Sequence, residues 1–264
     1  MPDLNRYAQI IEKIFLSKHK AGEREVAFER EDIERAAAKL GVELPKNLGD
    51  IPYTFRYRAS LPDSIRGLAP KGYEWVIMPA GRSRYAFVAM RVTEIVPTAM
   101  LAETKIPDAT PGVISMYALN DEQALLAKLR YNRLIDIFTG VACYSLQSHL
   151  RTAVKQFGQV ETDEIYVGID RRGAQYVFPV QAKGGRDRMS IVQITQDIAV
   201  CVKKFPDLIC RPIGAQFMAD QVIALFEFEE GDAGIVIASE KHYRLVSPDD
   251  LSKEELRAYQ HRPL

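Results

Sequence analysis

Four polar side chains whose types suit phosphodiester chemistry stand at the ends of two neighbouring segments of this 264-residue chain. Glu161 and Asp163 open the first segment, and Gln181 and Lys183 close the second. Carboxylates are ligands suited to Mg²⁺, which lowers the pKa of a bound water and neutralises charge on a phosphate. A nearby lysine holds the attacking water and stabilises the transition state. The amide oxygen of Gln181 is a weaker ligand because it is neutral, so a carboxylate from Glu161 or Glu164 would assist.

The two segments predict a β-hairpin that brings these side chains together. Residues 161–170 and 174–183 are rich in isoleucine, tyrosine and valine, as strands are. The loop between them ends in Gly173, where a type I turn followed by a bulge needs a positive φ. Counting pairs back from this turn places Asp163 opposite Gln181.

The far end of this hairpin is predicted to be a polar cluster. The same register places Glu161 opposite Lys183. Because residues two apart on a strand share a face, we expect both to lie in one cluster with Asp163 and its cross-strand partner. A bulge would slip one strand by a residue, and Glu164 or Thr162 would then take the place of Asp163.

The spacing of these residues resembles the active-site motif of the PD-(D/E)xK nucleases, a superfamily also called restriction-endonuclease-like. Asp163 matches the metal-binding acid of that motif, and Gln181-Ala-Lys183 matches its (D/E)xK element with glutamine in place of the usual acid. This variant is similar to the one in restriction nucleases of the Mrr type, which act on methylated DNA. Helical patterns over 134–157 and 190–205 resemble the α-β-β-α-β order of the family.

The resemblance covers about residues 120–220 and implies a Mg²⁺-dependent endonuclease that hydrolyses DNA, as a restriction or defence enzyme. The catalytic set that it implies consists of Asp163, Gln181, Lys183, Glu161 and Glu164. Within this set, Asp163, Gln181 and Glu164 would hold the metal, and Lys183 would position the attacking water. Double-stranded DNA is the implied partner, and two-fold symmetric DNA sites favour a homodimer.

Two other function classes fit the same residues. Neutral Gln181 favours a non-catalytic DNA-binding or regulatory protein on a nuclease-like scaffold. The formal net charge of zero, from 35 basic and 35 acidic residues, favours an interaction protein with no nucleic-acid role. For the cluster itself, the structural alternative is a hairpin whose charged end is simply solvated.

The N-terminal segment predicts a small α+β domain over 1–105, followed by a nuclease-like catalytic domain over 106–264. Apolar residues at helical spacing predict helices over 4–18 and 29–40, the second of them capped by Gly41. Two short helices followed by extended segments resemble a winged-helix layout, which favours a role in DNA binding.

Basic residues interleaved with aromatic residues suit phosphate contact and base stacking. Aromatic and basic residues alternate over 53–58, which predicts a strand with one face of each kind. The candidate DNA contacts are Arg56, Arg58, Arg82, Arg84 and Arg186. The alternative is an aromatic half-core with a solvated basic side. Residues 73–78 and 85–92 predict paired strands. Residues 103–112 contain two prolines and predict a linker or a segment that crosses the surface.

The remaining segments predict helices and strands in alternation. A helical region extends over 121–157 with a break at Gly140, and a further helix over 190–205. Strands are predicted over 210–218, 222–229, 234–238 and 243–246. Together with the hairpin they predict an α/β fold, in which helices flank a mixed central sheet with a restriction-endonuclease-like core.

Composition and the absence of targeting signals predict a cytoplasmic protein. The three cysteines form no CxxC pair and are expected to be buried free thiols. We expect no signal peptide and no membrane span, since no segment has the required apolar length. The four histidines lack metal-site spacing, and no phosphate-binding GxxxxGK loop is present, so ATP or GTP use is not expected.

Overall fold

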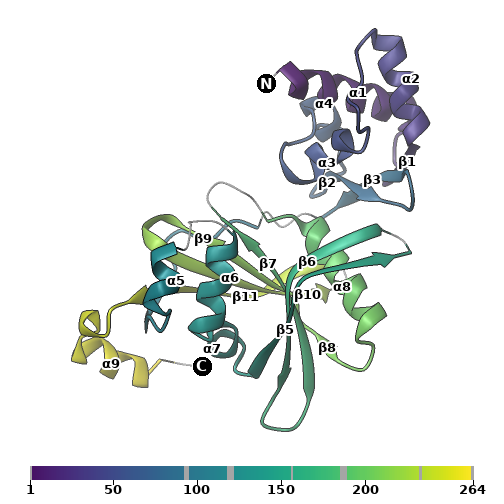
Figure 1. Cartoon of the computed structure of the whole chain (residues 1–264). Helices are drawn as coiled ribbons and strands as arrows, with labels where there is room; N and C mark the ends of the chain where they lie inside the picture. The colour runs from purple at the N-terminus through teal and green to yellow at the C-terminus, as the bar shows by residue number, and fades with distance from the viewer. Residues whose placement is uncertain are drawn as a thin grey trace.

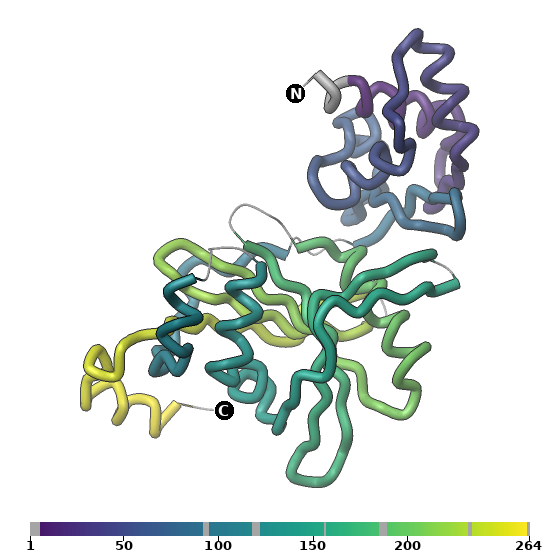
Figure 2. The backbone as a smooth tube through the Cα atoms, in the orientation of Figure 1, coloured from purple at the N-terminus to yellow at the C-terminus, as the bar shows by residue number. Residues whose placement is uncertain are grey.

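The structure, a computed structural model, describes residues 2–91, 95–117, 122–155, 157–184, 189–231 and 234–262. Within these ranges the chain forms a small N-terminal part with a three-stranded sheet and a larger part built on an eight-stranded sheet (Figure 1). The backbone trace in Figure 2 shows the N-terminal part on one side of the large sheet. Among the described residues, no helix combines the length and the apolar character needed to cross a membrane.

The N-terminal part packs four helices against the small sheet. In chain order its elements are α1 (Pro2–Lys18), β1 (Glu25–Glu29), α2 (Arg30–Leu40), α3 (Asp50–Tyr57), α4 (Asp63–Arg66), β2 (Glu74–Pro79) and β3 (Arg84–Met90). The sheet is antiparallel, in the order β1-β3-β2, and Ile10 and Phe87 are fully buried in the shared core. The helices predicted over 4–18 and 29–40, the Gly41 cap with its φ of 67° and the paired strands are confirmed.

The strand predicted over 53–58 is wrong, because this segment belongs to the helix α3. Ile51 and Phe55 are four residues apart and are both buried in the N-terminal core. Tyr53 and Tyr57, also four apart, pair on a second face with ring centroids 4.8 Å apart. The apparent alternation thus comes from two helical faces, and burial of the Ile51 face decided the conformation.

The larger part is an open mixed sheet with helices on both faces. In chain order its elements are β4 (Glu103–Pro107), α5 (Gly112–Tyr117), α6 (Glu122–Tyr131), α7 (Leu134–Thr139), β5 (Ala142–Val154), β6 (Gly158–Ile169), β7 (Gln175–Lys183), α8 (Ile191–Lys204), β8 (Ile209–Cys210), β9 (Ile213–Phe217), the 3₁₀ turn η1 (Ala219–Gln221), β10 (Val222–Gly231), β11 (Gly234–Val246), η2 (Pro248–Asp250) and α9 (Lys253–Gln260). The strand order is β4-β11-β10-β9-β7-β6-β5, with β8 beside β7. β4 is parallel to β11, and β8 and β9 are parallel to β7. These elements confirm the α/β class, with β11 joining the strands predicted over 234–238 and 243–246.

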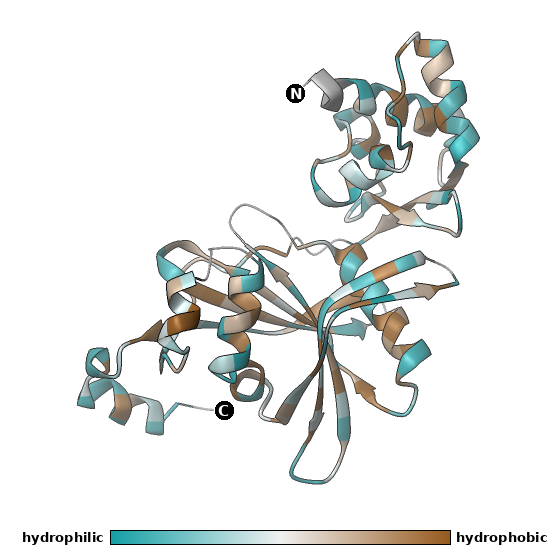
Figure 3. Cartoon of the chain, in the orientation of Figure 1, coloured by the Kyte–Doolittle hydropathy of each residue, from teal (hydrophilic) through white to brown (hydrophobic). Residues whose placement is uncertain are grey.

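Different helices cover the two faces of the large sheet. Phe178 and Val180 of β7 belong to an apolar cluster with Leu125 of α6, whereas Val177 packs with Cys201 of α8. Figure 3 shows hydrophobic residues concentrated on the strands between these helices. The end of the β6–β7 hairpin that carries the predicted site therefore lies between α6 and α8.

The second half of the helical region predicted over 121–157 is a strand. Gly140 ends α7 with a φ of 68°, as expected, but the chain then continues as β5. Cys143, Leu146 and Leu150 follow helical spacing, yet Leu146 is 52% exposed, so the three share no buried face. Pairing with β6 along the length of β5 decides its conformation.

The linker predicted over 103–112 is wrong in its first half, because β4 is an edge strand of the large sheet. Glu103 at its start accepts a hydrogen bond from Arg244 Nε of β11 at 2.7 Å. Pro107 is the last residue of the strand, so it interrupts no pairing before it. The domain boundary predicted at residue 105 falls within β4, and the division into two domains stays a prediction.

The N-terminal part and the large sheet meet through an apolar contact. Met78 of β2 belongs to one buried cluster with Ile191 of α8 and Phe226 of β10. Nearby, the Tyr57 hydroxyl of α3 donates to Gln196 Oε1 of α8 at 3.4 Å. These contacts hold α3 against the face of the large sheet that α8 covers.

Gly168 of β6 lies where neighbouring side chains leave no room for a Cβ atom. A Cβ added there would lie 2.7 Å from Val141 Cγ1 and 3.1 Å from Phe178 Cε2. We expect Gly168→Ala to lower the free energy of unfolding by about 1–3 kcal/mol in urea denaturation, because the core has no room for the methyl group. Gly112→Ala is the control, since nothing lies within 4 Å of its added Cβ. Equal losses in both variants would contradict this explanation.

Candidate functional site

A cleft of about 680 Å³ opens at the end of the β6–β7 hairpin. Three of the predicted catalytic residues line it: Glu161, Asp163 and Lys183. Glu122 of α6 and His149 of β5 join them, and residues of α3 and α8 complete the walls. The cleft thus gathers polar side chains from segments far apart in the sequence.

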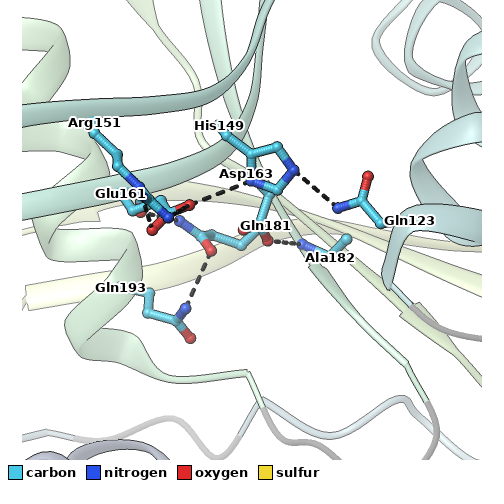
Figure 4. Close-up of polar contacts among 8 residues, drawn as sticks. All are labelled: Gln123, His149, Arg151, Glu161, Asp163, Gln181, Ala182 and Gln193. Carbon is cyan, nitrogen blue, oxygen red and sulfur yellow. Dashed lines mark hydrogen bonds and ion pairs between the residues drawn. The ribbon is translucent and has the colours of Figure 1, made fainter.

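The hairpin register is as predicted as far as the cleft. The turn closes as expected, with a φ of 83° at Gly173, and the β6–β7 ladder follows the counted register to the pair Glu164–Val180. Beyond this pair, the carboxylate of Asp163 accepts a hydrogen bond from the backbone N–H of Ala182 at 2.9 Å (Figure 4). The Asp163 side chain therefore accepts a hydrogen bond from the backbone of β7 at a point where the two strands no longer pair through their backbones.

Lys183 contacts an acid that the sequence did not single out. Its Nζ lies 2.9 Å from Oε1 of Glu122, in the first turn of α6. Asp163 lines the same cleft as these two residues. Burial raises the pKa of Asp163, the hydrogen bond from the Ala182 backbone and the charge of Lys183 lower it, and the charge of Glu122 raises it. An acid in a first helical turn ordinarily complements the helix dipole, so Glu122 carried no signal of a site.

Gln181 points into a buried network beneath α8. The residue is 1% exposed, and its Nε2 donates to both carboxylate oxygens of Asp197 at 3.1 and 3.0 Å. Its Oε1 accepts from Gln193 Nε2 at 3.1 Å (Figure 4). Thr162 Oγ1 donates to Asp197 at 2.6 Å. Both ends of the Gln181 amide are engaged, and these contacts do not support the predicted role of Gln181 as a metal ligand.

Asp197 is a fully buried acid that the sequence reasoning missed. Burial raises its pKa to about 7, although the hydrogen bonds from Thr162 and Gln181 lower it. The available signal was its position, three residues after Ile194 and four before Cys201, on the apolar stripe of α8. A carboxylate on such a stripe needs buried polar partners, because an isolated buried charge is unfavourable.

Glu161 and His149 both line the cleft, and their side chains contact each other (Figure 4). The Glu161 carboxylate lies 3.0 Å from Arg151 Nε and 3.3 Å from His149 Nδ1, and the hydrogen bond from Arg151 lowers the pKa of Glu161. The other ring nitrogen of His149 lies 3.0 Å from Gln123 Nε2, and His149 has a φ of 49°, which residues other than glycine rarely adopt. Glu161 therefore pairs with β5 rather than with Lys183, its predicted cross-strand neighbour.

Glu164 lies on the other face of the sheet, away from the cleft. It is fully buried, and its Oε1 accepts from Arg130 Nη2 of α6 at 2.8 Å and from Ser145 Oγ of β5 at 2.5 Å. Thr162 contacts α8 whereas Glu164 contacts α6, although residues two apart ordinarily share a face. The alternation of β6 thus shifts at Asp163, and the contacts of Glu164 do not support its predicted metal role.

Two of the five arginines proposed as DNA contacts lie at the cleft. Arg56 and Arg58, at the C-terminal end of α3, line it. Arg82 is exposed in the turn between β2 and β3, and Arg84 pairs with an acid of β1, so neither belongs to the cleft lining. Arg186 lies outside the described residues.

The acids at the cleft determine whether Mg²⁺ fits there. Among the described residues, no group of three or more His, Cys, Asp or Glu side chains is arranged to hold a metal ion. Mg²⁺ usually keeps several waters and needs only one or two carboxylates together with substrate phosphates. Asp163 and Glu122 each place a carboxylate in the lining of the cleft. This donor set fits a hydrated Mg²⁺ ion.

Asp197→Asn tests the buried carboxylate. The pKa of Asp197 rises from 3.8 to about 7 on folding, so its stabilising contribution is complete below pH 3.8 and is lost as the pH rises through about 7. In urea denaturation at about pH 5 and about pH 8, we expect the wild-type free energy of unfolding to fall more than that of Asp197→Asn. Exposed Asp249→Asn should keep the wild-type dependence, and a common slope in all three proteins would contradict the assignment.

Comparisons with known proteins leave the family of this chain open. The chain matches no protein-family model, and comparisons with curated proteins and with solved structures find no match either. The resemblance to the PD-(D/E)xK nucleases, including their core fold, therefore rests on the residues themselves and stays a prediction.

Proposed function

We propose that this protein is a metal-dependent endonuclease that hydrolyses phosphodiester bonds in DNA. The observation that supports it is the meeting of Asp163, Lys183 and Glu122 at one cleft, from β6, β7 and α6. A metal ion held by the two carboxylates would lower the pKa of a water and neutralise charge on the phosphate. Acids and a lysine are the groups that this chemistry requires.

The protein side chains have distinct parts in this proposal. Lys183 Nζ, 2.9 Å from Glu122, is held next to the carboxylates, where an ammonium group orients a water or contacts a phosphate oxygen. The Ala182 N–H fixes the orientation of the Asp163 carboxylate at 2.9 Å. Arg56 and Arg58 give α3 two cations for phosphate contact at the same cleft.

The proposal carries with it the finer expectations that the motif implies. Double-stranded DNA is the partner, a restriction or defence role is the context, and the cytoplasm is the compartment. A homodimer belongs to the same proposal, because two-fold symmetric DNA sites favour two copies of the enzyme. Sedimentation of the protein with and without DNA would measure that state.

Substitutions at the three central side chains test catalysis. We expect Asp163→Asn, Glu122→Gln and Lys183→Ala each to slow Mg²⁺-dependent plasmid cleavage by about 100-fold or more, because each removes charge that stabilises the transition state. Affinity for DNA without metal should change much less. The rates of plasmid nicking and linearisation, with Mg²⁺ or with EDTA, are the measurement.

Matched substitutions away from the cleft control for general effects of charge. Lys241→Ala on β11 and Asp249→Asn in η2 remove one charge of each sign from exposed positions and should keep the wild-type rate. If the wild-type protein cuts neither methylated nor unmethylated DNA when Mg²⁺ is added, the nuclease proposal fails.

A non-catalytic DNA-binding protein on the same scaffold is the second candidate. It is favoured by Gln181, whose amide is neutral and is already held by Asp197 and Gln193. DNA affinity that falls with rising salt, without cleavage under any metal condition, would select this function.

A further inference from the structure

One wall of the cleft is aromatic and basic, and it comes from the N-terminal part of the chain. Tyr53, Arg56, Tyr57 and Arg58 of α3 line the same cleft as Asp163. In Figure 1, α3 and the strands that follow it lie between the N-terminal helices and the large sheet. The acids of the proposed active site thus line the same open cleft as the rings and guanidinium groups of α3.

The aromatic surface is open to a ligand. Tyr53 is 42% exposed, and its ring centroid lies 4.8 Å from that of Tyr57. The guanidinium of Arg58 lies 5.1 Å from the centroid of the Tyr53 ring. Rings and arginine planes arranged in this way are the surfaces on which unpaired bases stack in proteins that bind single strands.

The positive charges of Arg56 and Arg58 are available to bind a phosphate. Within the described ranges, neither Arg56 nor Arg58 forms an ion pair with a carboxylate, and Arg56 Nε is buried without a hydrogen-bond partner. By contrast, Lys183 and Arg151 at the same cleft are already paired with acids. The unpaired positive charge of the cleft therefore lies on α3, beside the tyrosines.

The size of the cleft restricts what enters it. A volume of about 680 Å³ is within the range of roughly 300–1,000 Å³ that sites for single small molecules occupy. The bases of a DNA duplex are stacked on one another inside the helix, so a base can stack on a tyrosine ring only where it is unpaired or extruded. An unpaired strand can contact both the tyrosine rings, through its bases, and the arginines, through its phosphates. The bases of a fully paired duplex cannot reach the rings in this way.

We infer that the cleft takes an unpaired DNA strand, with a base stacked on Tyr53 and a phosphate bound by Arg56 or Arg58 next to Asp163. The inference rests on the proposed function and narrows its substrate class. DNA is cut where a strand is single, displaced or extruded from the duplex, and double-stranded DNA is a substrate only at such places.

Binding measured in EDTA tests the inference separately from cleavage. Fluorescence anisotropy would compare a labelled oligothymidine with a blunt-ended, fully paired duplex of similar length. We expect the wild-type protein to prefer the single strand, and Tyr53→Ala to weaken that binding by about tenfold, because the variant has lost the ring on which a base stacks. Tyr53→Phe keeps the ring and should keep the affinity. Tyr144→Ala removes a tyrosine that is 61% exposed on β5 and should change nothing.

The outcomes distinguish this inference from the proposed function. Duplex binding tighter than single-strand binding, or an unchanged affinity in Tyr53→Ala, would overturn the unpaired strand while leaving cleavage to be judged by the plasmid assay. Single-strand binding that requires Tyr53, in a protein that cuts no DNA with Mg²⁺, would support the inference and reject the nuclease. Equal affinity for an oligouridine would overturn the assignment to DNA.

Discussion

The hydrogen bond from the Ala182 backbone to the Asp163 carboxylate is the contact on which the candidate site depends. It follows directly after the last backbone pair of the hairpin, Glu164–Val180. A carboxylate, and not a backbone carbonyl of β6, therefore accepts the hydrogen bond from the Ala182 N–H. At the same residue the alternation of β6 shifts, and Thr162 and Glu164 turn to opposite faces of the sheet. A strand that kept its regular alternation would place all its even-numbered side chains on one face.

Buried polar pairs on both faces hold this irregular strand end in place. On one face Glu164 accepts from Arg130, and on the other Asp197 accepts from Thr162 and Gln181. Each carboxylate is fully buried, and burial without partners would be strongly unfavourable. These contacts place Thr162 and Glu164 on opposite faces of the sheet, while Asp163 lies at the cleft with Lys183 and Glu161.

The cleft belongs to both parts of the chain. The apolar contact of Met78 with Ile191 and Phe226 brings the N-terminal sheet against the large one, and α3 comes with it. As a result, acids from the large sheet and arginines of α3 that form no ion pair line the same cleft. The formal net charge of zero gives no sign of this local arrangement of charges. Charge totals describe the average surface of a protein, whereas catalysis and binding depend on where the charges meet.

The sequence by itself determined the hairpin, because the turn at Gly173 and the period of two fix its register through local geometry. It also determined α1, α2 and α8, whose apolar stripes have no competing pattern, and it drew attention to Asp163 and Lys183.

Only the tertiary structure decided that 53–58 is helical and that β5 is a strand, because in both segments the partner that buries the chain lies elsewhere in the sequence. For the same reason only the fold brought Glu122, His149 and Asp197 to the hairpin, since each comes from a different element and carries no local signal of its neighbours.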